Sequence, residues 1–251
     1  MRTDRITLAV TAAEAAECTG LGLRLAYLAY RISPSGVLLK SNALGQATGG
    51  VMAVMGGAPR LSDPAALVGA VTAECTAHAY EGVYLDFDER TPAAEFLIAS
   101  LAPRLSERGI TLYTNPLLDT GGVTVLSTSE VTGGSFSLYL RELRERYEDR
   151  TALEIVPLSV DFTLPSNGQG ETISQTRLAS LLDGGLMSYY SRELAAKYFT
   201  YQTPDGMTHF VLYDDAYTIR EKLETAEREG VSESFLPYGR LREELPDILE
   251  V

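Results

Sequence analysis

The chain has 251 residues, with 34 acidic and 21 basic side chains and a formal net charge of −13 at neutral pH. Hydrophobic residues make up 45% and charged residues 22%, which is the composition of a folded globular protein and excludes wholesale disorder. The acidic excess argues against nucleic acid or an anionic membrane as a partner, because both are bound through an excess of Lys and Arg.

Two further features narrow the class of protein. No apolar run approaches the roughly 20 residues of a membrane-spanning helix, and the first residues carry no visible secretion signal, so we expect a soluble chain. Cys18 and Cys75 are too few for a disulfide scaffold and are expected to be buried thiols. His78 falls in a predicted helix and His209 in a predicted hairpin, so the sequence predicts no metal site and no cofactor.

Short β-rich runs alternate with helix-like runs along the whole chain. The predicted strands are 6–10, 23–32, 51–55, 82–88, 110–114, 135–140, 153–162 and 231–236. The predicted helices are 11–19, 64–79, 92–108, 143–149, 217–229 and 240–251. About 50 residues separate the seventh strand from the helix at 217–229, more than a simple crossover needs. Within them, Pro204-Asp205-Gly206 lies between two β-rich runs, which indicates a β-hairpin.

Eight strands with intervening helices predict an α/β fold, a single (β/α)8 TIM barrel over residues 1–251. The hairpin is expected as an excursion between strands 7 and 8, in a region of about 165–215. The alternative is an open doubly wound sheet, which favours a glycine-rich phosphate turn after the first strand. The segment Val10–Glu14 has no such turn, so the barrel is favoured.

The fourth strand carries the strongest chemical signal. Tyr84, Asp86 and Asp88 alternate along it and therefore face the same side, which is the interior in a barrel. The two carboxylates fall at the carboxyl end of the strand, where barrel enzymes place their catalytic groups. Two carboxylates on one buried face repel each other, which raises at least one pKa and suits acid/base chemistry. The plainer alternative is that they cap the next helix or pair with an arginine.

The segment Glu81-Gly-Val-Tyr-Leu-Asp-Phe-Asp88 resembles the fourth-strand motif Asp-Gly-x-Asp-x-Asp-x-Glu of glycoside hydrolase family 18, the chitinase-like barrels, and particularly their bacterial spore-peptidoglycan branch. Other segments resemble further parts of the same family: Tyr27–Gly36 its second strand, Val51–Gly57 its third, Phe136–Leu140 its Met-x-Tyr-Asp strand, and Tyr198–Gly230 the stretch before its last strand. The likeness thus runs along most of the chain. With no secretion signal or membrane segment visible in the sequence, we expect a cytoplasmic or spore-associated protein.

The resemblance implies a retaining mechanism in which the acetamide of the substrate attacks the anomeric carbon. By position, Asp86 would orient the acetamide, Tyr139 would assist it, and Asp88 would occupy the place of the acid. The implied partner is a glycan with N-acetylhexosamine units, of the peptidoglycan or chitin type. Further side chains are expected near the carboxyl ends of the strands, where they would bind substrate: Tyr84, Tyr30, Tyr113, Asn115, Asp161 and Tyr238.

The departures from the motif all weaken ordinary hydrolysis. Asp88 is one methylene shorter than the motif's Glu, and a misplacement near 1 Å can lower a rate about a hundredfold. Tyr84 replaces the first carboxylate, and the chain has no tryptophan to floor the sugar subsite, which leaves Tyr238 for stacking. Three hypotheses remain open: a glycan-binding barrel with impaired catalysis, an active glycosidase that uses Asp88 as its acid, and a non-catalytic scaffold.

Overall fold

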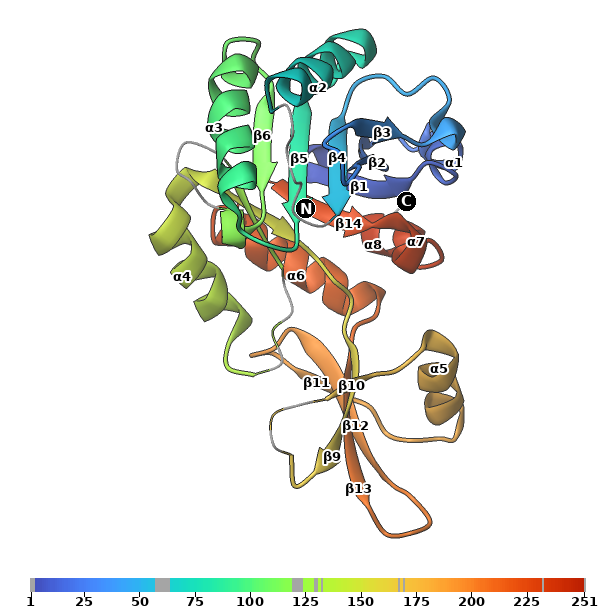
Figure 1. The fold of residues 1–251 in the computed structure, drawn as a ribbon. Coiled ribbons are helices and arrows are strands. Elements are labelled where there is room, and N and C mark those ends of the chain that lie inside the picture. Colours follow the sequence, from blue (N-terminus) through green and yellow to red (C-terminus); the bar gives the residue numbers. More distant parts are fainter. Residues whose placement is uncertain are drawn as a thin grey trace.

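Eight parallel strands close into a barrel in the part of the chain that the computed structural model describes (Figure 1), which comprises residues 3–56, 64–118, 124–128, 131, 133–166, 168, 170–231 and 233–250. The barrel strands are β1 Ile6–Thr11, β2 Arg24–Ile32, β4 Val51–Gly56, β5 Gly82–Phe87, β6 Thr111–Thr114, β7 Thr124–Thr128, β8 Thr151–Glu154 and β14 Glu233–Pro237. Closure follows because β1 pairs in parallel with both β14 and β2. The predicted barrel is therefore confirmed.

The helices lie outside the strands. They are α1 Ala15–Cys18, α2 Pro64–His78, α3 Pro92–Ser106, α4 Phe136–Tyr147, α6 Ala216–Arg228, α7 Tyr238–Leu241 and α8 Leu245–Leu249. Thr91 caps α3 by accepting a hydrogen bond from the Ala94 amide, and the predicted stripe of Leu97, Leu101 and Leu105 is fully buried. The short β3 Leu38–Lys40 is antiparallel to β2.

A second, antiparallel sheet extends from the barrel, in the lower part of Figure 1. Its strands are β9 Ser159–Leu164, β10 Glu171–Thr172, β11 Tyr189–Ser191, β12 Ala196–Gln202 and β13 Thr208–Tyr213, in the order β10-β9-β13-β12-β11. The helix α5 Gln175–Asp183 covers one face, where Leu178 packs with Phe199 and Val211. The segment between the seventh and eighth barrel strands is thus a five-stranded sheet with a helix.

Two strand predictions are wrong. Residues 135–140 begin α4, because Ser135 caps a helix by accepting a hydrogen bond from the Leu138 amide; the sixth barrel strand is Thr124–Thr128. The predicted strand 153–162 is two strands in different sheets, separated at Ile155–Leu158. Pro157 lies in that break, where its ring nitrogen cannot donate to a ladder.

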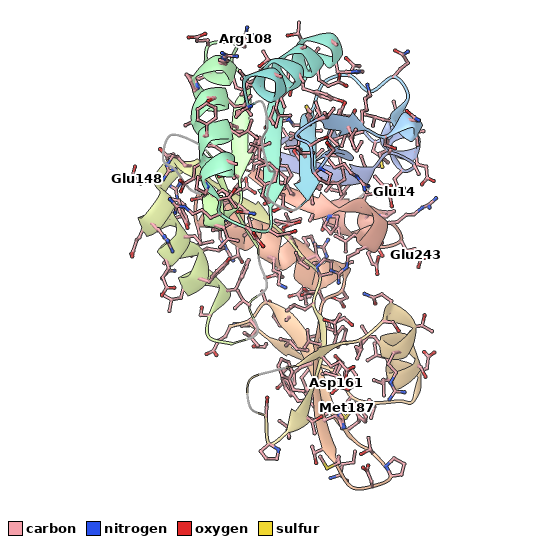
Figure 2. All side chains as sticks on the ribbon, in the orientation of Figure 1. Glu14, Arg108, Glu148, Asp161, Met187 and Glu243 are labelled. Atoms are coloured by element: carbon pink, nitrogen blue, oxygen red, sulfur yellow. The ribbon has the colours of Figure 1, made fainter. Side chains whose placement is uncertain are left out.

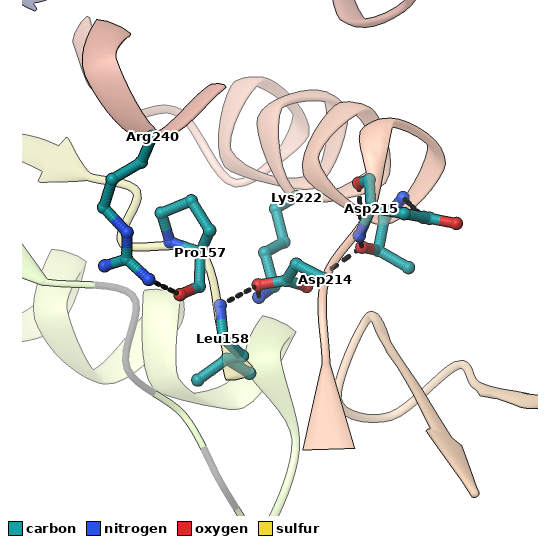
Figure 3. A network of polar contacts seen from close by, with 7 residues as sticks. Pro157, Leu158, Asp214, Asp215, Lys222 and Arg240 are labelled. Carbon is teal, nitrogen blue, oxygen red and sulfur yellow. Dashed lines mark hydrogen bonds and ion pairs between the residues drawn. The ribbon is translucent and has the colours of Figure 1, made fainter. Parts of the chain in front are cut away.

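The junction between barrel and second sheet is a buried polar network (Figure 3). Asp214, which follows β13, accepts hydrogen bonds from the Leu158 amide (2.8 Å), the Thr218 hydroxyl (2.9 Å) and the Lys222 ammonium (2.6 Å). The side chains of Asp214 and Lys222 have no solvent exposure. The network therefore joins the start of the second sheet to α6 of the barrel.

The amino-terminal end of the barrel interior is closed by a second network. Arg24 donates to Glu233 (2.7 Å) and to the Tyr113 hydroxyl (3.1 Å), and Tyr113 donates to Glu233 (2.5 Å). Above it, the Phe235 ring lies 5.3 Å from Tyr113 and 6.3 Å from Tyr84. This end of the interior is thus a packed core, and the polar side chains of β5 and β8 lie at the opposite, carboxyl end. No helix among the described residues is long and apolar enough to cross a membrane.

Candidate functional site

Tyr84, Asp86 and Asn115 form a polar group inside the carboxyl end of the barrel. Tyr84 and Asp86 alternate along β5, so both face inward, and Asn115 follows β6, which is paired with β5. The Asn115 Nδ2 donates to Asp86 Oδ1 (2.9 Å) and to the carbonyl oxygen of Phe87 (2.8 Å). Since both partners can only accept, the orientation of this amide is determined by its surroundings. Asp86 is thereby held in one position from two strands.

The Tyr84 hydroxyl joins the same group. It interacts with the Asp86 carboxylate, and its ring is buried between the barrel strands. Burial raises the pKa of Tyr84 strongly, and the negative charges of Asp86 and Glu154 raise it further. The phenol is therefore neutral at physiological pH and keeps its O–H as a donor beside Asp86.

Glu154 is a site residue that the sequence reasoning missed. It is the last residue of β8, and Ala152 two positions earlier belongs to the interior cluster of the barrel, so Glu154 faces the interior as well. Its negative charge raises the pKa of Tyr84. The alternation of Ala152 and Glu154 at a strand end is a usable signal. It is hidden by the run 153–162, which the sequence predicts as one long apolar strand.

Asp88 lies one residue beyond β5 and is exposed. Its place in the chain is that of the acid in the motif, but the described structure gives it no hydrogen bond to the group around Asp86. The two carboxylates of the predicted pair therefore have different environments, one half-buried and hydrogen-bonded, the other at the rim.

Two predicted tyrosines lie elsewhere in the barrel. The Tyr113 ring turns toward the amino-terminal end, where it lies against Gly82 and its hydroxyl meets Glu233; burial and the Glu233 charge raise the pKa of Tyr113 to about 12. Tyr30 faces outward because the register of β2 shifts between Tyr27 and Tyr30. Its hydroxyl bonds to Glu74 of α2 at 2.9 Å. Neither ring lies at the mouth.

The remaining three predicted residues are also outside the mouth. Asp161 belongs to β9 of the second sheet, as Figure 2 shows. Tyr139 lies on α4 beside Phe136 rather than on a strand, and the sixth barrel strand, Thr124–Thr128, contains no tyrosine. Tyr238 is buried in α7, with its hydroxyl 3.3 Å from Glu17. Gly57, at the end of the third-strand motif, is outside the described residues.

No group of three or more His, Cys, Asp or Glu side chains in the described ranges is arranged to hold a metal ion. What the mouth offers is a hydrogen-bonded carboxylate, an amide and a neutral phenol, together with Glu154 at the end of β8. A carboxylate held in this way can accept a hydrogen bond from a ligand N–H and stabilise a positive charge that develops close to it.

The fold as a whole is similar to that of solved chitinase structures. The chain is similar to a class V chitinase from Cycas revoluta in complex with (GlcNAc)3, with a TM-score of 0.68, 14% identity, and coverage of 97% of this chain and 98% of that one. The fold is that of the chitinase-like barrels of family 18.

Two bacterial structures agree with this assignment of the fold. The spore cortex-lytic enzyme SleL of Bacillus cereus gives a TM-score of 0.67 at 14% identity, over 94% of this chain and 70% of that one. A chitinase from Chromobacterium violaceum gives 0.64 at 15% identity, over 92% and 93%. No family profile and no curated sequence matches the chain. The resemblance inferred from sequence therefore holds for the fold.

Proposed function

We propose that the carboxyl-end mouth of the barrel binds a glycan that contains N-acetylhexosamine units, of the peptidoglycan or chitin type. The observation that carries this proposal is the group of Tyr84, Asp86 and Asn115, which presents one fixed carboxylate at the place where barrel proteins bind their ligands. Support also comes from the neighbours in fold, among them a chitinase in complex with (GlcNAc)3.

In this proposal Asp86 accepts the acetamide N–H of the bound sugar. Its negative charge would also stabilise the cationic intermediate that forms when the acetamide oxygen attacks the anomeric carbon and the glycosidic C–O bond breaks. Asn115 positions Asp86 by its hydrogen bond, and the adjacent Tyr84 hydroxyl interacts with the same carboxylate. The leaving oxygen needs a proton, and Asp88, short and exposed, is poorly suited to supply it, so we propose impaired turnover.

Calorimetric titration with chito-oligosaccharides and with peptidoglycan fragments tests the proposal. We expect binding, and we expect Asp86→Asn to weaken it at least tenfold because the acetamide loses a charged acceptor. The matched control is Asp149→Asn, whose side chain is 98% exposed on the outside of the barrel and should leave binding unchanged.

Product analysis separates the other hypotheses. Turnover that disappears in Asp88→Asn would establish an active glycosidase that uses Asp88 as its acid. Absence of binding to every aminosugar polymer would refute the proposal and leave the scaffold hypothesis.

A further inference from the structure

Polar side chains from several strands of the second sheet lie close together on the face that α5 covers. The register places Tyr201 of β12 opposite His209 of β13, and His209 opposite Thr163 of β9. Asp161, two residues before Thr163, is opposite Glu171 of β10. Because directly opposite residues of antiparallel strands have their side chains on the same face, four strands contribute to one polar cluster.

Asp161 orients His209 within this cluster. Its Oδ1 lies 2.9 Å from Nδ1 of His209, and its Oδ2 accepts the Tyr201 hydroxyl at 2.7 Å. The rings of Tyr201 and His209 stack with centroids 4.8 Å apart. A carboxylate on Nδ1 determines the tautomer, so Nε2 is the ring nitrogen left for a ligand, as an acceptor when the imidazole is neutral and as a donor when it is protonated.

A cavity of about 470 Å³ adjoins this cluster. Its polar wall consists of Asp161, Thr163, Glu171 and His209, and its apolar wall of Leu164, Pro165 and Met207. The volume is within the range of small-ligand sites, roughly 300–1,000 Å³. The side chains of Asp161 and His209 are only 11% and 18% exposed, so the polar groups at its base are held rigidly.

The lining restricts the chemistry of a ligand. Two carboxylates repel an anion, and the described residues contain no cluster arranged for a metal ion. A neutral sugar ring satisfies both walls, because its hydroxyls can donate to Glu171 and Thr163 and exchange a hydrogen bond with His209 Nε2. Its C–H face can pack on the apolar wall that includes Met207.

We propose that this cavity is a second glycan subsite, separate from the barrel mouth, which binds one sugar unit through His209, Glu171 and Thr163. The choice of an N-acetylhexosamine glycan rests on the proposed function, whereas the subsite itself rests on the geometry of the second sheet. A glycan held at both places would be bound over a longer stretch than the mouth alone allows.

The chain contains two histidines, which makes the test specific. The protein is labelled with ¹³C in the imidazole rings and titrated with (GlcNAc)3, and the two ring signals are followed by NMR. The signal of His209 should shift to saturation. The signal of His78 should stay, because that ring lies outside the barrel, bonded to the Ala47 carbonyl at 2.6 Å and to Lys40 at 2.7 Å.

Variants locate the binding. Glu171→Gln and Thr163→Ala should each weaken the His209 titration about fivefold or more, whereas Thr172→Ala, the next residue on the same short strand, should leave it unchanged. Asp86→Asn should weaken binding at the mouth and leave the midpoint of the His209 titration within about twofold.

Each other outcome overturns the inference. A His209 signal that does not move while calorimetry reports binding would refute the subsite and leave the proposed function intact. A His209 shift that disappears in Asp86→Asn would mean a single site, and a shift with phosphate or glucosamine but not with (GlcNAc)3 would mean a charged ligand. No binding by either method would refute both proposals.

Discussion

Asp214 and Lys222 form an ion pair of 2.6 Å whose two side chains are completely buried. Burial lowers the pKa of Lys222, and the adjacent Asp214 opposes this effect. The pair is accompanied by the Leu158 amide and the Thr218 hydroxyl, which satisfy the remaining acceptors of Asp214. Such a pair is costly to break, because removal of one partner leaves a buried charge without compensation.

The first prediction concerns this pair. Lys222→Met should lower the free energy of unfolding by about 3–5 kcal/mol, because the Asp214 charge stays buried. Urea unfolding followed by circular dichroism measures it. The control is Lys197→Met, which removes the partly exposed pair with Asp215 and should cost about 1 kcal/mol or less. Equal losses in the two variants would contradict the account.

The second prediction compares two adjacent glycines. Gly49 and Gly50 both have positive φ angles, 70° and 73°, but a Cβ at Gly50 would lie 2.2 Å from the Leu25 carbonyl oxygen, whereas a Cβ at Gly49 meets nothing within 4 Å. Gly49→Ala should therefore cost about 1–2 kcal/mol, the cost of the left-handed conformation. Gly50→Ala should cost at least about 2 kcal/mol more, because backbone must move. Comparable unfolding midpoints would refute this.

The third prediction is a pH dependence at Glu74. Burial raises the pKa of Glu74, but hydrogen bonds from Lys40 and Tyr30 lower it more, so its net pKa is below the ordinary value. The stabilisation is therefore present above the unfolded pKa of about 4.3 and is lost as the pH falls through the folded value. Glu74→Gln should lower stability by about 1 kcal/mol at pH 7, and the difference should shrink below pH of about 4.

Urea midpoints at pH 7, 5 and 3.5 measure this difference. Glu95→Gln, in an exposed pair with Arg90, serves as the control and should show little dependence on pH. A difference between Glu74→Gln and the natural chain that stays constant with pH would exclude the ionisation of Glu74 as its cause.

The fourth prediction uses the two interior tyrosines. Tyr84→Phe removes the hydroxyl that interacts with Asp86 and should lower affinity for (GlcNAc)3 about three- to tenfold, with little change in stability. Tyr113→Phe removes the hydroxyl between Arg24 and Glu233 and should lower stability while affinity stays constant. Calorimetry and urea unfolding on both variants measure the two effects. If Tyr113→Phe alone lost affinity, the ligand would bind at the amino-terminal end of the barrel, which would contradict the proposal.

The barrel could be predicted because its strands and helices have local signals. One structure fits each of three patterns, and the protein adopts it: the alternation of Tyr84 and Asp86, the Thr91-Pro92 helix start, and the stripe of Leu97, Leu101 and Leu105. The local sequence of the segment 135–140 is compatible with two structures. Its apolar alternation indicates a strand, whereas Ser135 as a cap and the charged run to Tyr147 favour a helix, and tertiary packing of Phe136 and Leu140 decides for the helix.

Most of the candidate site could not be predicted, because the positions of its side chains depend on more than the two-residue period of a strand. The register shift in β2 turns Tyr30 outward, and no local signal marks it. Tyr113 faces the barrel interior, as its position in the strand predicts. Gly82 has no side chain and leaves space for the Tyr113 ring, so the hydroxyl points to the amino-terminal end of the barrel. The apolar run 153–162 predicts Asp161 on the seventh barrel strand, but the chain breaks at Pro157 and Asp161 belongs to β9. In the segment around Asp86 and Asn115, both the strands and the direction of the side chains agree with the sequence prediction.

The chain leaves the barrel and returns to it at one point. Asp214 donates its amide to the Leu158 carbonyl at 3.0 Å and accepts the Leu158 amide on its side chain at 2.8 Å, so the two ends of the segment 159–213 are in contact. A segment with touching ends can be exchanged, enlarged or shortened without any change in the path of the host chain. The second sheet can therefore change as a separate unit, in evolution or in protein engineering, while the closure of the barrel stays the same.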